Sequence, residues 1–184
     1  MKQIILIASF VLIAAGIAFL GVLGGLFQFS LERSAPTIEN FDACAKRGYQ
    51  IMESYPRQCR APGGKIFMED IGNVREKSDR IRVRSVTPNQ TVKSPLAVEG
   101  EARGFWFFEA SFPVRLFDAQ GNELAVTVAE AQDEWMTEEF VPFRATITFE
   151  PPNTEKGIVV LRKDNPSGLP EHDDELRIPV RFGQ

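Results

Sequence analysis

Two cysteines and one histidine carry the chemistry that this sequence restricts most clearly. Cys44 and Cys59 could form a reactive thiol pair, but redox pairs usually follow C-x-x-C spacing, and fourteen residues separate these two. In an oxidising compartment they would form a disulfide that closes a loop of about 16 residues and contributes roughly 3 kcal/mol. His172 alone cannot supply two imidazole ligands, and any Ser-His or Cys-His site would have to use it. We expect a structural disulfide and no metal site or cofactor.

Acidic side chains gather in two segments, "DEWMTEE" at 133–139 and "HDDE" at 172–175. Neither has the regular D-x-D spacing of a dedicated calcium loop, so a solvated acidic rim is the simpler interpretation. A glycosidase would need two carboxyl groups held in different environments, and nothing in the sequence marks such a pair. We therefore expect no catalytic residue, and a hydrolase that uses these acids stays as an unfavoured alternative.

Net charge and its distribution limit the partners. The chain has 184 residues and a formal net charge of −4, and its acidic excess falls in residues 80–184. Proteins that bind nucleic acids are usually basic, so nucleic acid is not expected as a partner. Residues 31–79 are balanced in charge, and residues 1–30 contain one charged side chain, Lys2.

Residues 4–27 form an apolar run that contains no charged side chain. Its 24 residues are enough for a helix to cross a bilayer core, which takes roughly 20. A secretory signal has a shorter apolar region and a small-residue cleavage site, although a cleaved signal remains the alternative. Lys2 before the run favours a cytoplasmic N-terminus. The sequence predicts a single-pass anchor at 1–30 that binds the lipid bilayer and leaves the C-terminal domain outside the cytoplasm.

Residues 31–79 contain both cysteines and a linker. So short a segment buries little apolar surface, so a covalent bond between Cys44 and Cys59 would supply much of its stability. Similar "C…GY…MESYPRQC…GG" segments recur in bacterial envelope proteins, and this resemblance implies no activity. The apolar residues expected to pack around the bridge are Phe41, Tyr49, Ile51, Met52, Tyr55, Ile66 and Phe67.

From residue 80 onward, apolar and polar side chains alternate with the period of half-buried strands. Turn-forming segments such as "DAQGNE" and "PPNTEKG" separate the runs. Seven short strands without a helix predict an all-β fold, an immunoglobulin-like seven-strand sandwich. Pro113, Pro142 and Pro179 fall inside strands, where each should mark an edge or a bulge. The predicted strands cover 80–86, 96–102, 108–117, 124–131, 140–149, 157–163 and 175–182.

Several blocks of this region resemble a known family. "TPNQTVKSPLAVEGEARGFWFFEASFPVRLFDAQGNEL", "WMTEEFVPFRATITF" and "VVLRKDNPSGLPEHDDELRIPVRF" are similar to the immunoglobulin-like domain of bacterial spore germination proteins. The resemblance extends over 80–182, within the domain that we assign to 80–184. It implies a non-enzymatic interaction or scaffolding domain at the cell envelope, and it transfers no catalytic residue.

In an immunoglobulin-like topology, the loops predicted at 103–107, 132–138 and 164–173 share one end of the sandwich. Their aromatic side chains could form a recognition surface, or they could fold inward and cap the core. The chain should enter the sandwich at this end, so the disulfide module should stay near it. The module would either pack on the exposed aromatic residues and shield them or form one binding surface with this end, and we favour the shared surface because the linker looks solvated. The candidate binding residues are Phe105, Trp106, Trp135, Met136, Leu169, Glu171, Asp173 and Asp174.

These expectations together describe a membrane-anchored binding or scaffolding protein of the bacterial envelope that is not an enzyme. Its partner would be an envelope protein or a cell-wall glycan. An accessory module that presents wall polymer to an enzyme is the alternative.

Overall fold

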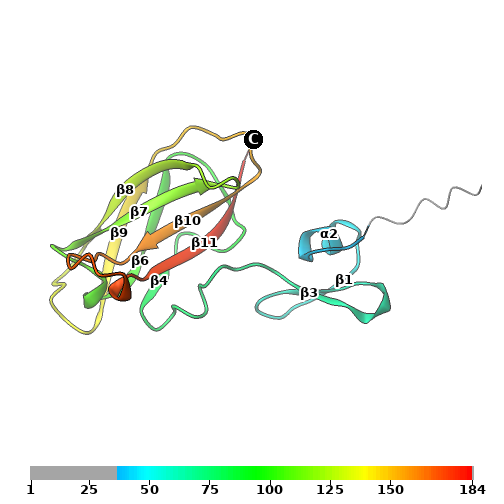
Figure 1. The fold of residues 1–184 in the computed structure, drawn as a ribbon, viewed down its shortest axis with the longest axis horizontal. Coiled ribbons are helices and arrows are strands. Elements are labelled where there is room, and N and C mark those ends of the chain that lie inside the picture. Colours follow the sequence, from blue (N-terminus) through cyan, green and yellow to red (C-terminus); the bar gives the residue numbers. More distant parts are fainter. Residues whose placement is uncertain (1–36, 184) are drawn as a thin grey trace, which may run out of the picture. The chain divides into compact units, whose positions relative to one another are not determined.

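The strands from residue 81 onward form one folded sheet (Figure 1). The computed structural model describes residues 37–183. The strand order in the sheet is β4-β6-β9-β8-β7-β10-β11-β5. The strands are β4 (Ile81–Val83), β5 (Thr91–Val92), β6 (Leu96–Arg103), β7 (Ser111–Asp118), β8 (Glu123–Ala131), β9 (Phe140–Ile147), β10 (Lys156–Arg162) and β11 (Glu175–Phe182).

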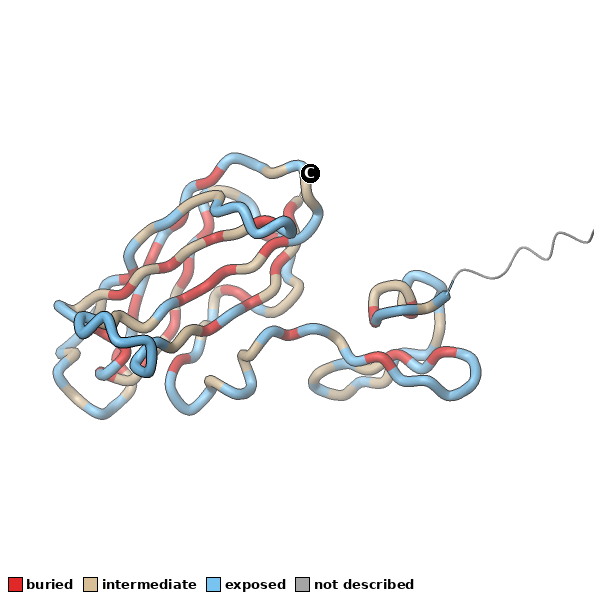
Figure 2. The backbone as a smooth tube through the Cα atoms, in the orientation of Figure 1, coloured by how far each residue is buried: buried red, intermediate tan, exposed pale blue. Residues whose placement is uncertain are grey.

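The sheet folds over between β8 and β9, which pair only at Glu130 with Arg144 and Ala131 with Phe143. The strands on the two sides of this seam therefore face each other, and one core fills the space between them. This confirms the predicted mostly-β, sandwich-like fold. Buried and more exposed residues alternate along β7, β9 and β11, as the sequence pattern predicts (Figure 2). Within this core, Phe112 contacts both Phe107 and Phe143 edge to face.

Two strand predictions need correction. The structure has eight strands here, because the chain crosses from β4 to the opposite edge and adds the two-residue β5 in parallel to β11. The third predicted strand, 108–117, begins at Ser111 in the structure. Glu109 and Ala110 have positive φ angles of 49° and 61°, so the chain turns where an extended strand was expected. Phe108 consequently points away from the core and is exposed.

The three prolines lie in strands that have neighbours on both sides, so the prediction of edges or bulges was wrong. Each instead lies where an adjacent strand does not reach. The Pro142 carbonyl accepts a hydrogen bond from the Gln132 amide, and the Pro179 carbonyl accepts one from the Asn89 amide. Both donors are loop residues. The nitrogen of each proline points to the same side as its carbonyl, so it faces a loop and not a strand. β10 stops pairing with β7 at Val114, one residue short of Pro113. A proline thus removes no ladder hydrogen bond at any of the three positions.

The disulfide module has its own small core. Helix α2 (Phe41–Lys46) begins at Asn40, whose side chain accepts a hydrogen bond from the Ala43 amide, and precedes a three-stranded antiparallel sheet. The Cys44–Cys59 disulfide is present, with Cα atoms 6.1 Å apart, which confirms that prediction. The strands are β1 (Gln50–Met52), β2 (Gln58–Arg60) and β3 (Ile66–Met68).

Only part of the expected packing forms around the bridge. Phe41 and Phe67 are buried against the disulfide, and Tyr49 packs beside them. Ile51, Tyr55 and Ile66 are exposed instead, because a three-stranded sheet covered by one helix has one buried face.

No helix among residues 37–183 is long and apolar enough to cross a membrane. The predicted anchor at 4–27 lies outside the described residues.

Candidate functional site

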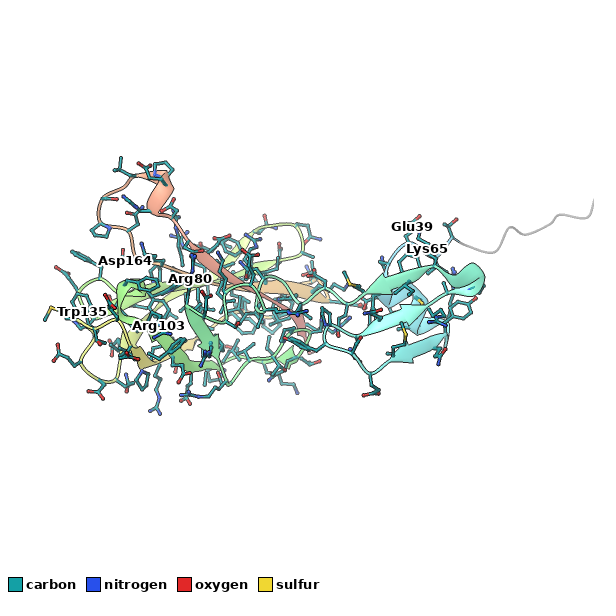
Figure 3. All side chains as sticks on the ribbon, turned by 90° about the horizontal axis from the view of Figure 1, so that it is seen from below. Glu39, Lys65, Arg80, Arg103, Trp135 and Asp164 are labelled. Carbon is teal, nitrogen blue, oxygen red and sulfur yellow. A yellow bond between two sulfur atoms is a disulfide. The ribbon has the colours of Figure 1, made fainter. Side chains whose placement is uncertain are left out.

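The three loops predicted to meet at one end of the sandwich do so. The Gly104 amide donates a hydrogen bond to the Glu139 carbonyl at 3.2 Å, which joins the β6–β7 loop to the β8–β9 loop. The Asp164 amide donates to the Trp106 carbonyl at 3.1 Å, which joins the first of these to the β10–β11 loop. Figure 3 shows Trp135, Asp164 and Arg103 at this end. We call it the loop end.

Gly104 permits the first of these contacts. A Cβ atom at this position would lie 1.9 Å from the Thr137 carbonyl oxygen and 2.4 Å from that of Trp135. Backbone atoms cannot tolerate such distances, so only glycine lets these loops approach so closely. This role of Gly104 was not predicted, although a glycine directly before the aromatic run "FWFF" is a signal for close backbone approach.

Trp106 is part of the core. Its side chain is 0% exposed and packs in the main cluster of buried residues. It therefore offers no surface to a partner, and its inclusion among the candidate binding residues was wrong. Its indole Nε1 is buried without a hydrogen-bond partner. Trp135 is half-buried and packs partly against the same core. One part of its side chain therefore covers the core, and the rest is accessible to a partner.

Three other candidate residues are exposed. Phe105, Met136 and Leu169 are 51%, 74% and 49% exposed, and they lie on three different loops. We call them the apolar loop residues. Hydrogen bonds join the loops that carry them, so these side chains are candidates for one apolar surface of the kind that binds other molecules.

The acidic candidates have internal partners. Asp174 accepts hydrogen bonds from Lys77 at 2.7 Å and Arg80 at 2.6 Å. Burial opposes ionisation of Asp174, but these two bonds outweigh it and lower its pKa below the ordinary value. Asp173 accepts from Asn165 and Arg162, and these bonds lower its pKa too. Both carboxylates thus hold the loop end together.

Glu171 and His172 complete the acidic segment. Both are exposed in the short 3-10 helix η3 (Pro170–His172). The His172 amide donates to the Leu169 carbonyl, and its own carbonyl accepts from Lys163. The contacts of His172 are thus those of a loop residue. Within residues 37–183, no group of three or more His, Cys, Asp or Glu side chains is arranged to hold a metal ion.

Comparison with known families gives a match to residues 80–169. This segment matches the immunoglobulin-like domain of bacterial spore germination. The match confirms the resemblance found in the sequence, and it contains two of the three loops at the loop end entirely. No curated protein and no solved structure matches the chain.

Strand β11 lies beyond the matched segment. It nevertheless belongs to the same sheet, because it pairs with β10 along seven residues. We call residues 80–184 the germination-type domain. Arg80, the first matched residue, lies at the loop end as expected, because its carbonyl accepts a hydrogen bond from the Arg103 amide. Arg103 in turn donates to the Glu138 carbonyl and stacks on Phe140, with Arg82 on the same ring. This cluster was not predicted from the sequence.

The linker before the germination-type domain is docked, contrary to the expectation of a solvated segment. Ile71 is buried, and the Asn73 side chain accepts a hydrogen bond from the Arg177 amide at 2.7 Å. The same side chain donates to the Glu175 carbonyl at 2.9 Å. The Asn73 side chain thus forms hydrogen bonds with backbone groups of β11 that a neighbouring strand would otherwise pair with. The linker was expected to be solvated because the segment "REKSD" is rich in charged residues, but the contacts are made by Ile71 and Asn73, which precede it.

The disulfide module contacts the far ends of the strands from the loop end. Asp42 forms ion pairs with Lys156, the first residue of β10, and with Arg181, near the end of β11. Asn89 donates to Glu69 and to the Asp70 carbonyl. A binding surface shared by the module and the loop end is therefore wrong, since the linker runs along β11 between them.

Proposed function

We propose that this protein is a membrane-anchored, extracytoplasmic binding protein of the bacterial envelope that recruits another envelope protein through its loop end. The observation that carries the proposal is the exposure of the apolar loop residues Phe105, Met136 and Leu169. The match to a spore-germination-type domain, the disulfide and the apolar run at 4–27 support the location.

The chemistry of the loop end favours a protein over a glycan. Carbohydrate binding generally uses a flat aromatic face, but Trp106 is fully buried and Trp135 is half-buried. The most exposed side chain is Met136, a flexible and polarisable group that adapts to protein surfaces. Phe105, on the loop that Gly104 joins to Glu139, supplies an aromatic side chain of a type that is enriched at protein interfaces.

The described acids do not favour a hydrolase. Asp173 and Asp174 are held as ionised partners of arginine and lysine, with lowered pKa values. A glycosidase acid needs a raised pKa, so that it carries a proton at neutral pH. We therefore assign the protein a binding role without catalysis.

Site-specific photo-cross-linking in cells tests the binding surface. A photoreactive amino acid at Met136 should give a discrete adduct with one envelope protein, and Phe105→Ser should remove it. The control is the same amino acid at Glu155, which is exposed and precedes Lys156 at the far end of the sandwich. Equal adducts at both positions, or none at Met136, would refute recruitment through the loop end.

Mass spectrometry of the purified protein tests the anchor separately. An intact N-terminus that includes residues 4–27 is expected. A mature chain that starts near residues 30–35 would show cleavage and refute the anchor, but not the binding surface.

A further inference from the structure

Strand β8 has one edge without a partner strand over most of its length. It pairs with β7 from Glu123 to Glu130, with a register shift that skips Leu124, but with β9 only at Glu130 and Ala131. Figure 1 shows β8 alongside β7 at the border of that layer. Proteins usually protect such an edge with charged side chains, especially lysine, with proline, or with a bulge that twists the edge away from a partner. The segment 124–129, with the sequence LAVTVA, has neither charge nor proline.

Two hydrogen bonds fix the direction of the free backbone groups. The Ala131 amide donates to the Ala110 carbonyl on the β7 side, whereas the Gln132 amide donates to the Pro142 carbonyl on the β9 side. Amide direction alternates along a strand, so Val126 and Val128 direct their N–H and C=O groups to the free edge. Their side chains are exposed as well, at 56% and 52%. The edge therefore combines available hydrogen-bonding groups with exposed β-branched side chains.

The sequence at this edge is a palindrome: Ala125, Val126, Thr127, Val128 and Ala129 read the same in both directions. We infer that β8 pairs with β8 of a second copy of this chain, antiparallel and centred on a two-fold axis at Thr127. In this register, Val126 lies opposite Val128 of the second copy, and the four valines meet on one face. Such self-complementarity is what an isologous dimer requires.

Backbone direction limits the register. A shift by one residue would set residues whose N–H and C=O groups point to the free edge against residues whose groups point to β7, so no ladder could form. The pairing stays within 125–129, because Glu130 already pairs with Arg144 of β9. So short a pairing predicts a weak dimer, one favoured where the copies are concentrated in one membrane.

A single introduced thiol tests this register. Thr127 would form a non-hydrogen-bonded pair with itself, with Cα atoms about 4.5 Å apart, within disulfide range. Two copies of Val126 would be about 8–9 Å apart, which is too far to bridge. Because Cys44 and Cys59 are already bonded, each variant carries one free thiol. We expect Thr127→Cys in the full-length chain in detergent to form at least five-fold more covalent dimer than Val126→Cys under mild oxidation.

Lysine substitutions provide the second arm. Val126→Lys together with Val128→Lys, introduced into the Thr127→Cys chain, should abolish the cross-link while circular dichroism shows an unchanged fold, because both valines are exposed. Equal cross-linking of Thr127→Cys and Val126→Cys would indicate random collision and overturn the inference. So would the absence of a Thr127→Cys dimer, or a cross-link that survives the lysines. None of these results bears on binding at the loop end.

Discussion

Substitution of Trp106 gives the sharpest test of how the loop end is supported. The side chain is fully buried in the main core, and its indole Nε1 has no hydrogen-bond partner. Truncation of a buried tryptophan to alanine costs about 3–5 kcal/mol, and we expect Trp106→Ala to lower the free energy of unfolding by that amount.

Trp106→Phe should behave very differently. The smaller ring loses the transfer free energy of the removed atoms, and a cavity of about 40 Å³ adds about 1 kcal/mol at roughly 24 cal/mol per Å³. Removal of a buried, unpaired N–H group recovers about 1–3 kcal/mol. The two effects offset each other, so the phenylalanine variant should match or slightly exceed the wild-type stability.

Urea unfolding followed by circular dichroism measures both variants, because the signal does not depend on the tryptophan that is removed. Trp135→Ala is the matched control, and its half-buried side chain should cost less than Trp106→Ala. A loss of more than about 2 kcal/mol for Trp106→Phe would mean that the indole N–H has a partner, and would refute the reasoning. Equal costs for the two alanine variants would refute the assignment of Trp106 to the core.

Three further predictions concern other parts of the molecule. Gly104→Ala should lower the free energy of unfolding by about 1–3 kcal/mol in thermal unfolding, because its Cβ would meet the Thr137 carbonyl; an unchanged melting temperature would contradict this. The pKa of Asp174 is lowered in the folded state, so its stabilising effect is present above about pH 4 and lost as the pH falls further. Asp174→Asn should therefore be less stable than wild type at pH 7, and this difference should narrow as the pH falls below about 4; a difference that does not narrow would count against the ion pairs. Replacing Cys44 and Cys59 by serine should remove roughly 3 kcal/mol from the module and expose 41–70 to protease, and cleavage that extends into 80–184 would show that the sandwich depends on the module.

Strand positions were predictable because strict alternation identifies a half-buried strand without reference to the rest of the fold. The strand over 140–147 illustrates this, since Val141, Phe143 and Ala145 are all buried as the pattern requires. β5 was missed because two residues are too few to show a period. Its place in the sheet depends instead on the parallel pairing of Thr91 and Val92 with β11.

The candidate site was harder to predict, because side-chain direction in loops is not periodic. Phe105 and Trp106 are neighbours in the sequence, yet one is half exposed and the other is fully buried. The short helix η2 (Gly104–Trp106) turns the two rings in different directions, and it depends on the space that Gly104 leaves for the next loop. The docked linker was equally hidden, because the charges around Asn73 are those of a solvated segment.

The docked linker also limits how far the module and the loop end can move relative to each other. A free segment of nine residues, such as 71–79, would let its ends move over roughly 15–18 Å. Held by Asn73 at β11 and by Lys77 at Asp174, the same segment acts as a fixed spacer. Asn73→Ala would remove the hydrogen bonds to β11 and let the linker move, without changing the length of the chain. The reach of the loop end is therefore set by a few hydrogen bonds along β11 and not by the number of residues in the linker.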